Sequence, residues 1–165
     1  MSKKKRTQRT KELYLILHNI RSVYNVGSLF RTADAAGVSR IYLSGFTPAP
    51  LDRFGKKRSD FHKSALGAED TVPWETRKHS GSLLKELKRK KVHLIAVEQS
   101  LGSQDYKKVK PRYPAALVLG NEVKGLSDAV LKQCDVVAEI PMRGKKESLN
   151  VSVAAGIVLF RILNV

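Results

Sequence analysis

Two short runs, 94–97 and 116–119, are apolar at every position, reading Leu-Ile-Ala-Val and Ala-Leu-Val-Leu. A strand with one solvated face alternates apolar and polar residues, so these runs predict strands that are buried on both faces. We expect strands at 13–19, 40–45, 92–98, 115–120 and 136–141. Segments with helical spacing lie between them or follow them, at 25–37, 81–91, 126–134 and 148–163. This alternation predicts an α/β fold in which helices flank a parallel sheet.

Small polar residues mark the expected helix starts, because their side chains accept hydrogen bonds from free backbone amides. Asn25 is the expected N-cap of the first helix, and Gly37 is expected to end it. The expected first residues or caps of the later helices are Ser80 or Ser82, Ser127 and Ser148. The segment 47–78 is polar, contains proline and gives no clear pattern.

The length of 165 residues fits one domain, expected over 11–165 and preceded by a basic flexible tail at 1–10. No run of about 18 apolar residues is present, so no membrane span is expected. The basic N-terminus is not followed by the apolar segment of a secretory signal. The single cysteine, Cys134, excludes an intramolecular disulfide and fits a reducing cytoplasm. A buried position at a helix end is favoured for it over a role as nucleophile.

Lysine and arginine number 31 against 15 acidic residues, which gives a formal net charge of +16. Basic clusters lie at 3–11, 53–58, 85–91, 107–112 and 143–146. Such a domain attracts polyanions, because binding releases condensed counterions. Solvated helix faces are an alternative explanation, and it fits the cluster at 85–91 best. Nucleic acid is favoured over a membrane surface, because no helix pairs a broad apolar face with the cations.

Three loops follow predicted strands, and ligands of open α/β sheets bind beyond the carboxyl ends of strands. The loop after 13–19 leads to Asn25, Gly27 and Arg31. The loop after 115–120 contains Gly120, Glu122 and Gly125. The loop after 136–141 contains Pro141 and Gly144, and it ends in Ser148, Leu149 and Asn150.

Each loop also has a structural explanation when it is taken alone. Arg31 could pair with Asp34, the glycines could form a common turn, and Ser148 could only cap a helix. The glycine spacing matches neither a phosphate-binding loop nor a dinucleotide fingerprint. One cysteine and histidines at 18, 62, 79 and 93 give no metal-binding spacing, so no metal is expected. The site should therefore work through an organic cofactor or through positioning.

Taken together, the three loops closely resemble the SpoU class of the SPOUT RNA methyltransferases, the group that includes TrmH. The first motif of that family corresponds to Asn25, Gly27 and Arg31, and the second to Leu117, Gly120, Glu122 and Gly125. The third corresponds to Ile140, Pro141, Met142, Gly144, Ser148, Leu149, Asn150, Val151 and Ser152. The resemblance covers residues 12–165, and its third motif is highly specific.

The resemblance implies S-adenosylmethionine as methyl donor and a ribose 2′-hydroxyl of RNA as acceptor. It also implies an α/β fold with a C-terminal deep trefoil knot, and a homodimer with its site at the subunit interface. The residues implied to bind the cofactor are Gly120, Ile140 and Leu149, with Ala96, Val97, Glu98 and Met142 as neighbours. The residues implied for catalysis and substrate positioning are Asn25, Arg31, Glu122, Ser148 and Asn150. We expect RNA contacts from Arg143, Lys145 and Lys146 and from Arg53, Lys56, Lys57 and Arg58.

Physical chemistry limits the roles of these residues. An arginine stays protonated at neutral pH, so Arg31 is expected to stabilise the developing alkoxide and to grip a phosphate rather than act as a base. Glu122 is expected to orient the motif loops or Arg31. Ser148 and Asn150 are expected to hold the pocket and the substrate ribose.

Two other functions are open at this point. The chain could be a catalytically inactive knotted dimer that only binds RNA, although its complete motifs argue against this. It could also methylate a base, although no dedicated acidic residue for that reaction is evident. The target is either tRNA or rRNA, and a cytoplasmic location is expected.

Overall fold

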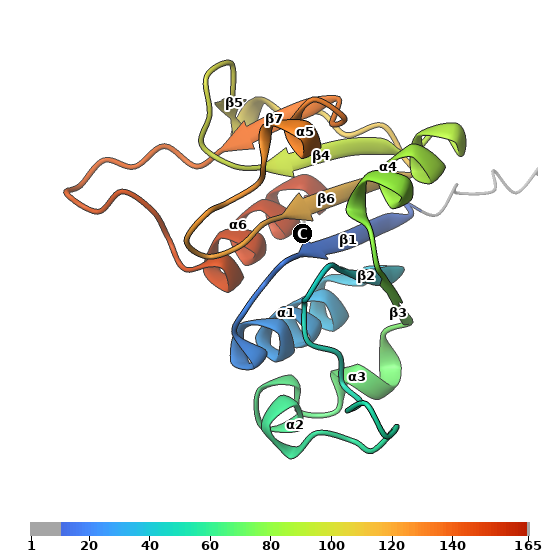
Figure 1. Cartoon of the computed structure of the whole chain (residues 1–165). Coiled ribbons are helices and arrows are strands. Elements are labelled where there is room, and N and C mark those ends of the chain that lie inside the picture. Colours follow the sequence, from blue (N-terminus) through green and yellow to red (C-terminus); the bar gives the residue numbers. More distant parts are fainter. Residues whose placement is uncertain (1–10, 165) are drawn as a thin grey trace, which may run out of the picture.

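The computed structural model describes residues 11–164, which form a sheet with helices on both faces (Figure 1). The described strands are β1 Leu13–His18, β2 Arg40–Ser44, β3 Trp74–Arg77, β4 His93–Val97, β5 Gln104–Asp105, β6 Ala115–Leu119 and β7 Val136–Glu139. Their order in the sheet is β3-β2-β1-β6-β4-β7-β5, and every neighbouring pair is parallel. The predicted α/β fold with a parallel sheet is confirmed.

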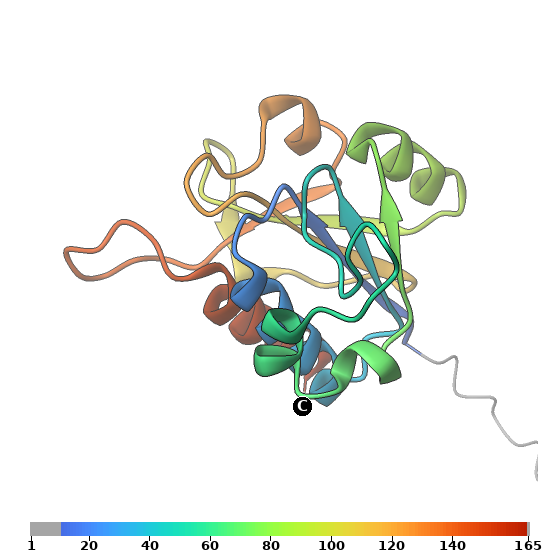
Figure 2. The same cartoon turned by 60° about the horizontal axis from the view of Figure 1, so that its bottom comes forward.

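The helices are α1 Val23–Ala36, α2 Ser59–Ala65, α3 Ala68–Thr71, α4 Ser80–Arg89, α5 Asp128–Leu131 and α6 Val151–Leu163, with a 3-10 turn at Tyr106–Lys108. Helices α1, α2, α3 and α6 lie on one side of the sheet, and α4 and α5 lie on the other (Figure 2). No helix among residues 11–164 is long and apolar enough to cross a membrane.

The strands feed two separate cores, because successive side chains point to opposite faces of the sheet. In β1, Leu15 and Leu17 pack toward α1 and α6, whereas Ile16 packs toward α4. In β6, Leu117 joins the first core and Val118 joins the second. The continuous apolar runs therefore reflect burial on both faces, as predicted.

The five predicted strands are confirmed within two residues at their ends, but the helices need corrections. The helix predicted at 126–134 spans only Asp128–Leu131, and Cys134 lies beyond its end. Burial raises the pKa of the Cys134 thiol to about 12, which makes it a poor nucleophile.

The segment 47–78, which shows no clear sequence pattern, contains α2, α3 and β3. The tail predicted at 1–10 lies outside the described residues.

The segment 141–150, between β7 and α6, projects from the body of the molecule (Figure 1). It contains no helix or strand, and its residues from Arg143 to Asn150 are exposed. The same segment carries most of the third motif, so the structure presents these residues at the surface of the single chain.

Candidate active site

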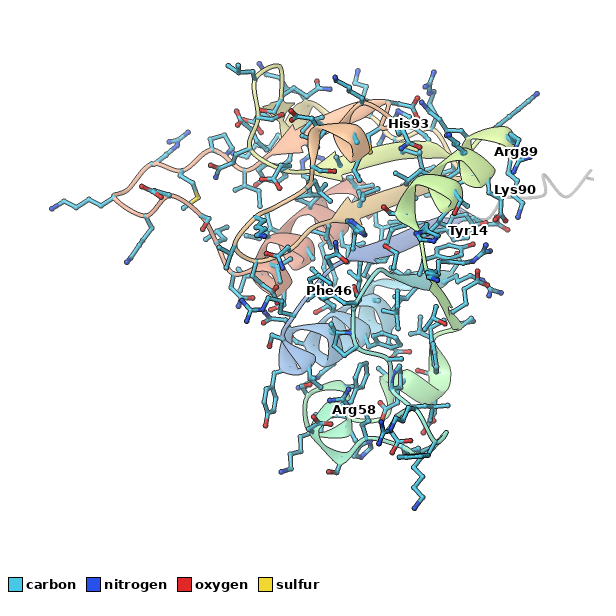
Figure 3. The ribbon with its side chains drawn as sticks, in the orientation of Figure 1. Tyr14, Phe46, Arg58, Arg89, Lys90 and His93 are labelled. Atoms are coloured by element: carbon cyan, nitrogen blue, oxygen red, sulfur yellow. The ribbon has the colours of Figure 1, made fainter. Side chains whose placement is uncertain are left out.

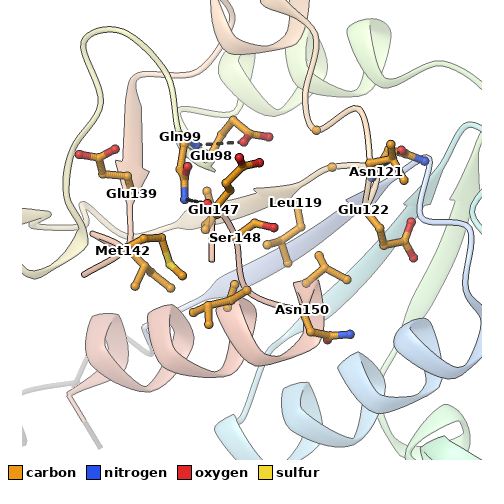
Figure 4. A pocket seen from close by; sticks show the side chains of 18 of the residues that line it. Glu98, Gln99, Leu119, Asn121, Glu122, Glu139, Met142, Glu147, Ser148 and Asn150 are labelled. Carbon is orange, nitrogen blue, oxygen red and sulfur yellow. Dashed lines mark hydrogen bonds between the residues drawn. The ribbon is translucent and has the colours of Figure 1, made fainter. Parts of the chain in front are cut away.

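A cavity of about 600 Å³ lies at the carboxyl ends of β4, β6 and β7, where the motif loops meet (Figure 4). Most of the predicted catalytic and cofactor-binding residues line it: Asn25, Val97, Glu98, Gly120, Glu122, Ile140, Met142, Ser148, Leu149 and Asn150. Two further lining residues, Gly125 and Val151, belong to the motifs, although no role is predicted for them. Sequence reasoning missed the other lining residues: Gln99, Leu119, Asn121, Val123, Glu139, Glu147 and Ala154. Most of these are immediate neighbours of a motif residue.

Glu122 holds the loop after β6 against the start of α1. Its carboxylate accepts hydrogen bonds from the backbone amides of Arg21 at 2.9 Å and Ser22 at 3.0 Å, and from the Asn25 side-chain amide at 3.1 Å. Burial disfavours the charged form, but these donors outweigh it and hold the pKa of the Glu122 carboxyl below its ordinary value. A carboxylate with a lowered pKa is a weak base, so this geometry suits loop orientation rather than proton abstraction.

Asn25 and Asn150 connect all three motifs. The Asn150 Nδ2 donates to the Asn25 Oδ1 at 3.2 Å, and the Asn25 Nδ2 donates to Glu122. The Asn150 Oδ1 also accepts from the backbone amide of Ser152 at 2.9 Å and from its hydroxyl at 2.6 Å. One side chain thus caps α6 and contacts the first motif.

Two predicted helix caps are wrong by a few residues. The N-cap of α1 is Ser22, whose hydroxyl accepts from the Asn25 amide at 3.2 Å, and Asn25 lies inside the first turn. The N-cap of α6 is Asn150 rather than Ser148. In both places two cap-forming residues lie two or three positions apart, and tertiary contacts decide which one begins the helix. The C-cap Gly37 is as predicted, with a φ of 71°.

Two glycines allow the loop after β6 to fold tightly against the end of β4. Gly125 has a φ of 64°, and a Cβ there would lie 2.3 Å from Glu98 Oε2. A Cβ on Gly120 would lie 2.7 Å from the backbone carbon of Gly125. Glu98 fixes this loop from the other side by accepting from the Leu126 amide at 2.9 Å. Gly120 is therefore required by close approach to backbone, and Gly125 by its positive φ and by its contact with the Glu98 side chain.

Ala96 and Arg31 are the two predicted site residues that do not line the cavity. The side chain of Ala96 is fully buried toward α4, because it alternates with Ile95 and Val97 along β4. The side chain of Ala96 therefore points away from the cavity, and a contact of its backbone with the cofactor stays a prediction. Arg31 lies exposed on α1, outside the cavity of the single chain. No Arg31–Asp34 ion pair forms among residues 11–164, where Asp34 accepts from the Thr71 hydroxyl at 2.7 Å.

The basic residues predicted to bind RNA fall into two separate places. Arg143, Lys145 and Lys146 are exposed on the projecting segment beside the cavity. The second group, Arg53, Lys56, Lys57 and Arg58, lies near α2, and Figure 3 shows Arg58 there. Lys57 pairs with Asp70 at 2.8 Å and Arg58 with Asp60 at 2.9 Å, which reduces the net positive charge of this group. An RNA contact at either place stays a prediction.

The acidic residues of the cavity contrast with the basic chain as a whole. Glu98, Glu139 and Glu147 line the cavity beside the apolar side chains of Val97 and Ile140. In residues 11–164, no group of three or more His, Cys, Asp or Glu is arranged to hold a metal ion. The cavity therefore combines apolar walls with carboxylates, which suits an organic ligand that carries positive charge.

Comparison with known proteins gives a consistent family. The profile of the SpoU rRNA Methylase family matches residues 12–160. The 23S rRNA (guanosine-2′-O-)-methyltransferase RlmB of Bordetella pertussis is 36% identical over 148 residues, covering 90% of this chain and 58% of that protein. This chain thus spans little more than half the length of that curated relative.

Two solved structures share the fold. The AdoMet-bound rRNA methyltransferase from Sinorhizobium meliloti has a TM-score of 0.83 and 30% identity, covering 93% of this chain and 56% of that one. The A. aeolicus TrmH/SpoU tRNA modifying enzyme has a TM-score of 0.81 and 29% identity, covering 94% of this chain and 76% of that one. Both likenesses extend over nearly all of the described residues.

Proposed function

The chain belongs to the SpoU rRNA methylase family, and from this premise we propose that it is an RNA 2′-O-ribose methyltransferase that uses S-adenosylmethionine. The observation that carries the proposal is the cavity in which Glu122, Asn25 and Asn150 join the three motif loops. A relative with 36% identity is named for methylation of a guanosine 2′-hydroxyl, which gives the reaction class.

The cavity fits the proposed cofactor in size and in chemistry. Its volume of about 600 Å³ is typical of pockets for ligands of this size. Val97, Ile140 and Leu149 offer apolar walls for a purine ring. Glu98, Glu139 and Glu147 offer carboxylates to a ligand that carries a sulfonium and an ammonium group. When bound, S-adenosylmethionine supplies an electrophilic methyl group on positively charged sulfur.

The residues of the chain then align the acceptor and stabilise its charge. Asn25 and Asn150 fix the mouth of the cavity, where a ribose can approach, and Glu122 holds Asn25 in place. Alignment of this kind supplies much of the rate in group-transfer reactions. A protonated arginine beside the hydroxyl would stabilise the developing alkoxide, and we assign this role to Arg31. The hydroxyl proton would pass to water or to a phosphate oxygen of the RNA.

The exposed position of Arg31 supports a homodimer in which this residue reaches the site of the other subunit. Val153, Ile157 and Phe160 form an exposed apolar stripe on α6, at 50%, 37% and 37% exposure. Tyr24, at 58% exposure, adds an apolar group from α1, the helix that carries Arg31. Burying this stripe against a second copy would bring Arg31 of the partner subunit toward the motif loops.

The C-terminal trefoil knot is a further part of the proposal. The chain leaves the sheet at β7, beyond β4, and returns through the projecting segment to α6, which packs against α1 and the strands β4 and β6. Residues 148–150 thereby share one cavity with the loop 119–125. In the proposed knot, residues 140–163 pass through the loop that connects β6 to β7.

Ribosomal RNA is the first candidate substrate because the curated relative acts on 23S rRNA, and tRNA is the second because a solved relative is named as a tRNA modifying enzyme. The cytoplasm is the proposed place of action. The test is transfer of labelled methyl groups from S-adenosylmethionine to total RNA, followed by nuclease digestion and mass spectrometry. We expect one 2′-O-methylated nucleotide in one RNA class.

Three outcomes would contradict this proposal. If the cofactor binds but the label stays out of every RNA fraction, the enzyme assignment fails. If the purified chain binds RNA but not S-adenosylmethionine in calorimetric titration, the inactive RNA-binding dimer becomes the better assignment. Label in a base rather than in a ribose would contradict the reaction class.

A further inference from the structure

A second cavity, of about 520 Å³, lies next to the first and has no role in the proposed reaction so far. Its floor is formed by His18 and Asn19 at the end of β1, and its rim by Arg21, Phe46 and Lys124. Asn121, Val123 and Gly125 line both cavities, so a single loop separates them. Neighbouring parts of one ligand can therefore occupy the two cavities at once.

The rim presents an aromatic side chain that the fold itself does not need. Phe46 follows β2 (Figure 3), and its side chain is 61% exposed. Its backbone amide donates to the Asn19 Oδ1 at 3.1 Å, which fixes the main chain under the ring. Val123, at 80% exposure, adds an apolar group to the same cavity. A large exposed aromatic side chain at the mouth of a cavity is suited to stack on a planar ligand.

The polar side chains of the floor are already engaged with one another. The His18 ring lies 2.9 Å from the Ser44 hydroxyl and 3.2 Å from the Asn19 amide. The Asn121 side chain donates to the Asn19 carbonyl at 2.9 Å and accepts from the amides of Val123 and Lys124. Such a floor is rigid and offers few free groups for reading the edge of a base.

The charge of the rim selects an anionic ligand. Burial lowers the pKa of the His18 imidazole, so the ring is neutral at pH 7. The cations that line the cavity are Arg21 and Lys124, both exposed. An aromatic face with two cations beside it matches a nucleotide with its base on the ring and its phosphate near the cations.

We propose that the second cavity binds an unpaired nucleobase of the RNA substrate, stacked on Phe46, from the nucleotide next to the one whose ribose is methylated. This inference rests on the proposed RNA methyltransferase function. The polar groups of the floor are hydrogen-bonded to one another, so few of them are free to bind the edge of a base. Recognition in this cavity therefore comes from stacking and phosphate contact, and it tolerates different bases. The site thereby selects single-stranded or locally opened RNA rather than a sequence.

The direct test is binding of short single-stranded RNA by Phe46 variants without methyl transfer. By fluorescence anisotropy, Phe46→Ala should weaken binding by roughly 10- to 100-fold, the range expected for loss of one stacked base. Phe46→Trp should restore binding, which a merely structural role would not predict. The matched control is Leu101→Ala, because Leu101 is fully exposed but lies outside both cavities and outside the basic groups predicted to contact RNA. Equal effects of Phe46→Ala and Leu101→Ala would overturn the inference.

Photocrosslinking identifies the stacked position itself. Short RNA that contains 5-iodouridine should crosslink to Phe46 on irradiation, and crosslinks confined to other peptides would contradict the site. Oligo(U), oligo(C) and oligo(A) should bind within about tenfold of one another if stacking dominates. A much stronger preference for one base would contradict recognition by stacking alone.

The charged part of the site has its own test. Lys124→Ala should reduce the dependence of RNA affinity on salt by about one phosphate contact, whereas Lys132→Ala, an exposed residue outside both cavities, should not. Equal salt slopes in the two variants would count against phosphate contact by Lys124.

The failure of this inference is distinguishable from failure of the proposed function. If the wild-type chain methylates RNA and Phe46→Ala does so with unchanged KM and kcat, the nucleobase site is wrong and the function stands. If RNA crosslinks to Phe46 but no methyl group is transferred, the nucleobase site stands and the proposed function is wrong.

Discussion

The carboxylate of Glu122 is positioned to organise the site as an anion. Two backbone amides and the Asn25 side chain donate to it, so it compensates for free amides at the start of α1. Its pKa lies below the ordinary value of 4.5, because these donors outweigh the effect of burial. The charged form is therefore the one that the folded chain stabilises.

Glu122→Gln keeps the shape of this residue and removes its charge. An NH₂ group would then face one of the amide donors, and we expect a loss of about 1–3 kcal/mol in the free energy of unfolding at pH 7. A lowered folded pKa contributes stability above the unfolded pKa, and this stability is lost as the pH falls through the folded pKa. The stability difference between wild type and variant should therefore be full at neutral pH and shrink below about pH 4.5. Denaturant unfolding from pH 7 to pH 3 measures it.

A pH-independent stability difference would show that the charge of Glu122 is not used. Activity gives a separate check, because a general base would add its own ionisation to the rate profile. We expect Glu122→Gln to lower the rate while the pH profile of the remaining activity keeps its shape. A missing acidic limb in the variant would instead favour Glu122 as a base.

Asn150 combines a helix cap with a contact to the first motif, and one substitution separates the two. Asn150→Asp keeps the oxygen that accepts from Ser152 but loses the donor to Asn25. We expect its thermal stability to stay near wild type, because a carboxylate is favourable at a helix N-terminus, while methyl transfer falls about tenfold or more. Asn150→Ala should lose activity and also about 1 kcal/mol of stability. Full activity of Asn150→Asp would contradict a role for this donor.

At the scale of elements, the loop 120–126 depends on backbone that only glycine adopts readily. Gly125→Ala combines a φ of 64° with a Cβ that would lie 2.3 Å from Glu98 Oε2. The backbone term alone costs about 1–2 kcal/mol, and the contact also displaces a side chain that holds the Leu126 amide. We expect weaker binding of S-adenosylmethionine and a lower melting temperature.

Gly144→Ala is the matched control for Gly125→Ala. Gly144 belongs to the third motif, but a Cβ there meets no atom within 4 Å, and its φ is not in the left-handed region. Calorimetric titration with S-adenosylmethionine and thermal unfolding should leave this variant near wild type. Similar losses at both glycines would indicate that the tight approach at Gly125 is not the cause.

The strands could be predicted because a strand that is buried on both faces consists of consecutive apolar residues. The elements of 47–78 could not, because α3 and β3 have four residues each and are too short for a period to show. The N-caps of α1 and α6 are Ser22 and Asn150 rather than the predicted Asn25 and Ser148, because several neighbouring residues can cap each helix. Periodicity locates an element, whereas its first residue depends on contacts with distant segments.

The site was predictable as a set of loops but not as a geometry. The position of β6 between β1 and β4 brings the loops together, and no local pattern contains that order. The pleat of β4 turns Ala96 into the core while Val97 and Glu98 reach the cavity. The internally bonded floor formed by His18, Asn19 and Asn121 has no sequence signal, because it joins residues about 100 positions apart.

At the scale of the whole molecule, two features of the single chain support the proposed homodimer. The α6 stripe of Val153, Ile157 and Phe160 exposes apolar surface, and no arginine or lysine is among the described residues that line the cavity, although the proposed reaction uses Arg31. Arg31 lies on α1, which packs against α6, so a dimer built on this stripe would place Arg31 near the subunit boundary. One arrangement thereby accounts for both features.

Mixed dimers test whether Arg31 acts across that boundary. Arg31→Ala and Asn150→Ala should each be nearly inactive alone, because each lacks one part of every site. In a mixed dimer, an arginine that acts in trans gives one site with both residues intact and one site with neither. Random mixing should then restore about a quarter of wild-type activity, since half of the dimers are mixed and each has one good site. If Arg31 acts within its own subunit, no site is intact and the mixture stays inactive. A tag carried by only one variant allows pull-down of the other variant, which checks that mixed dimers have formed. If mixed dimers are present and the mixture is inactive, Arg31 acts in its own subunit's site.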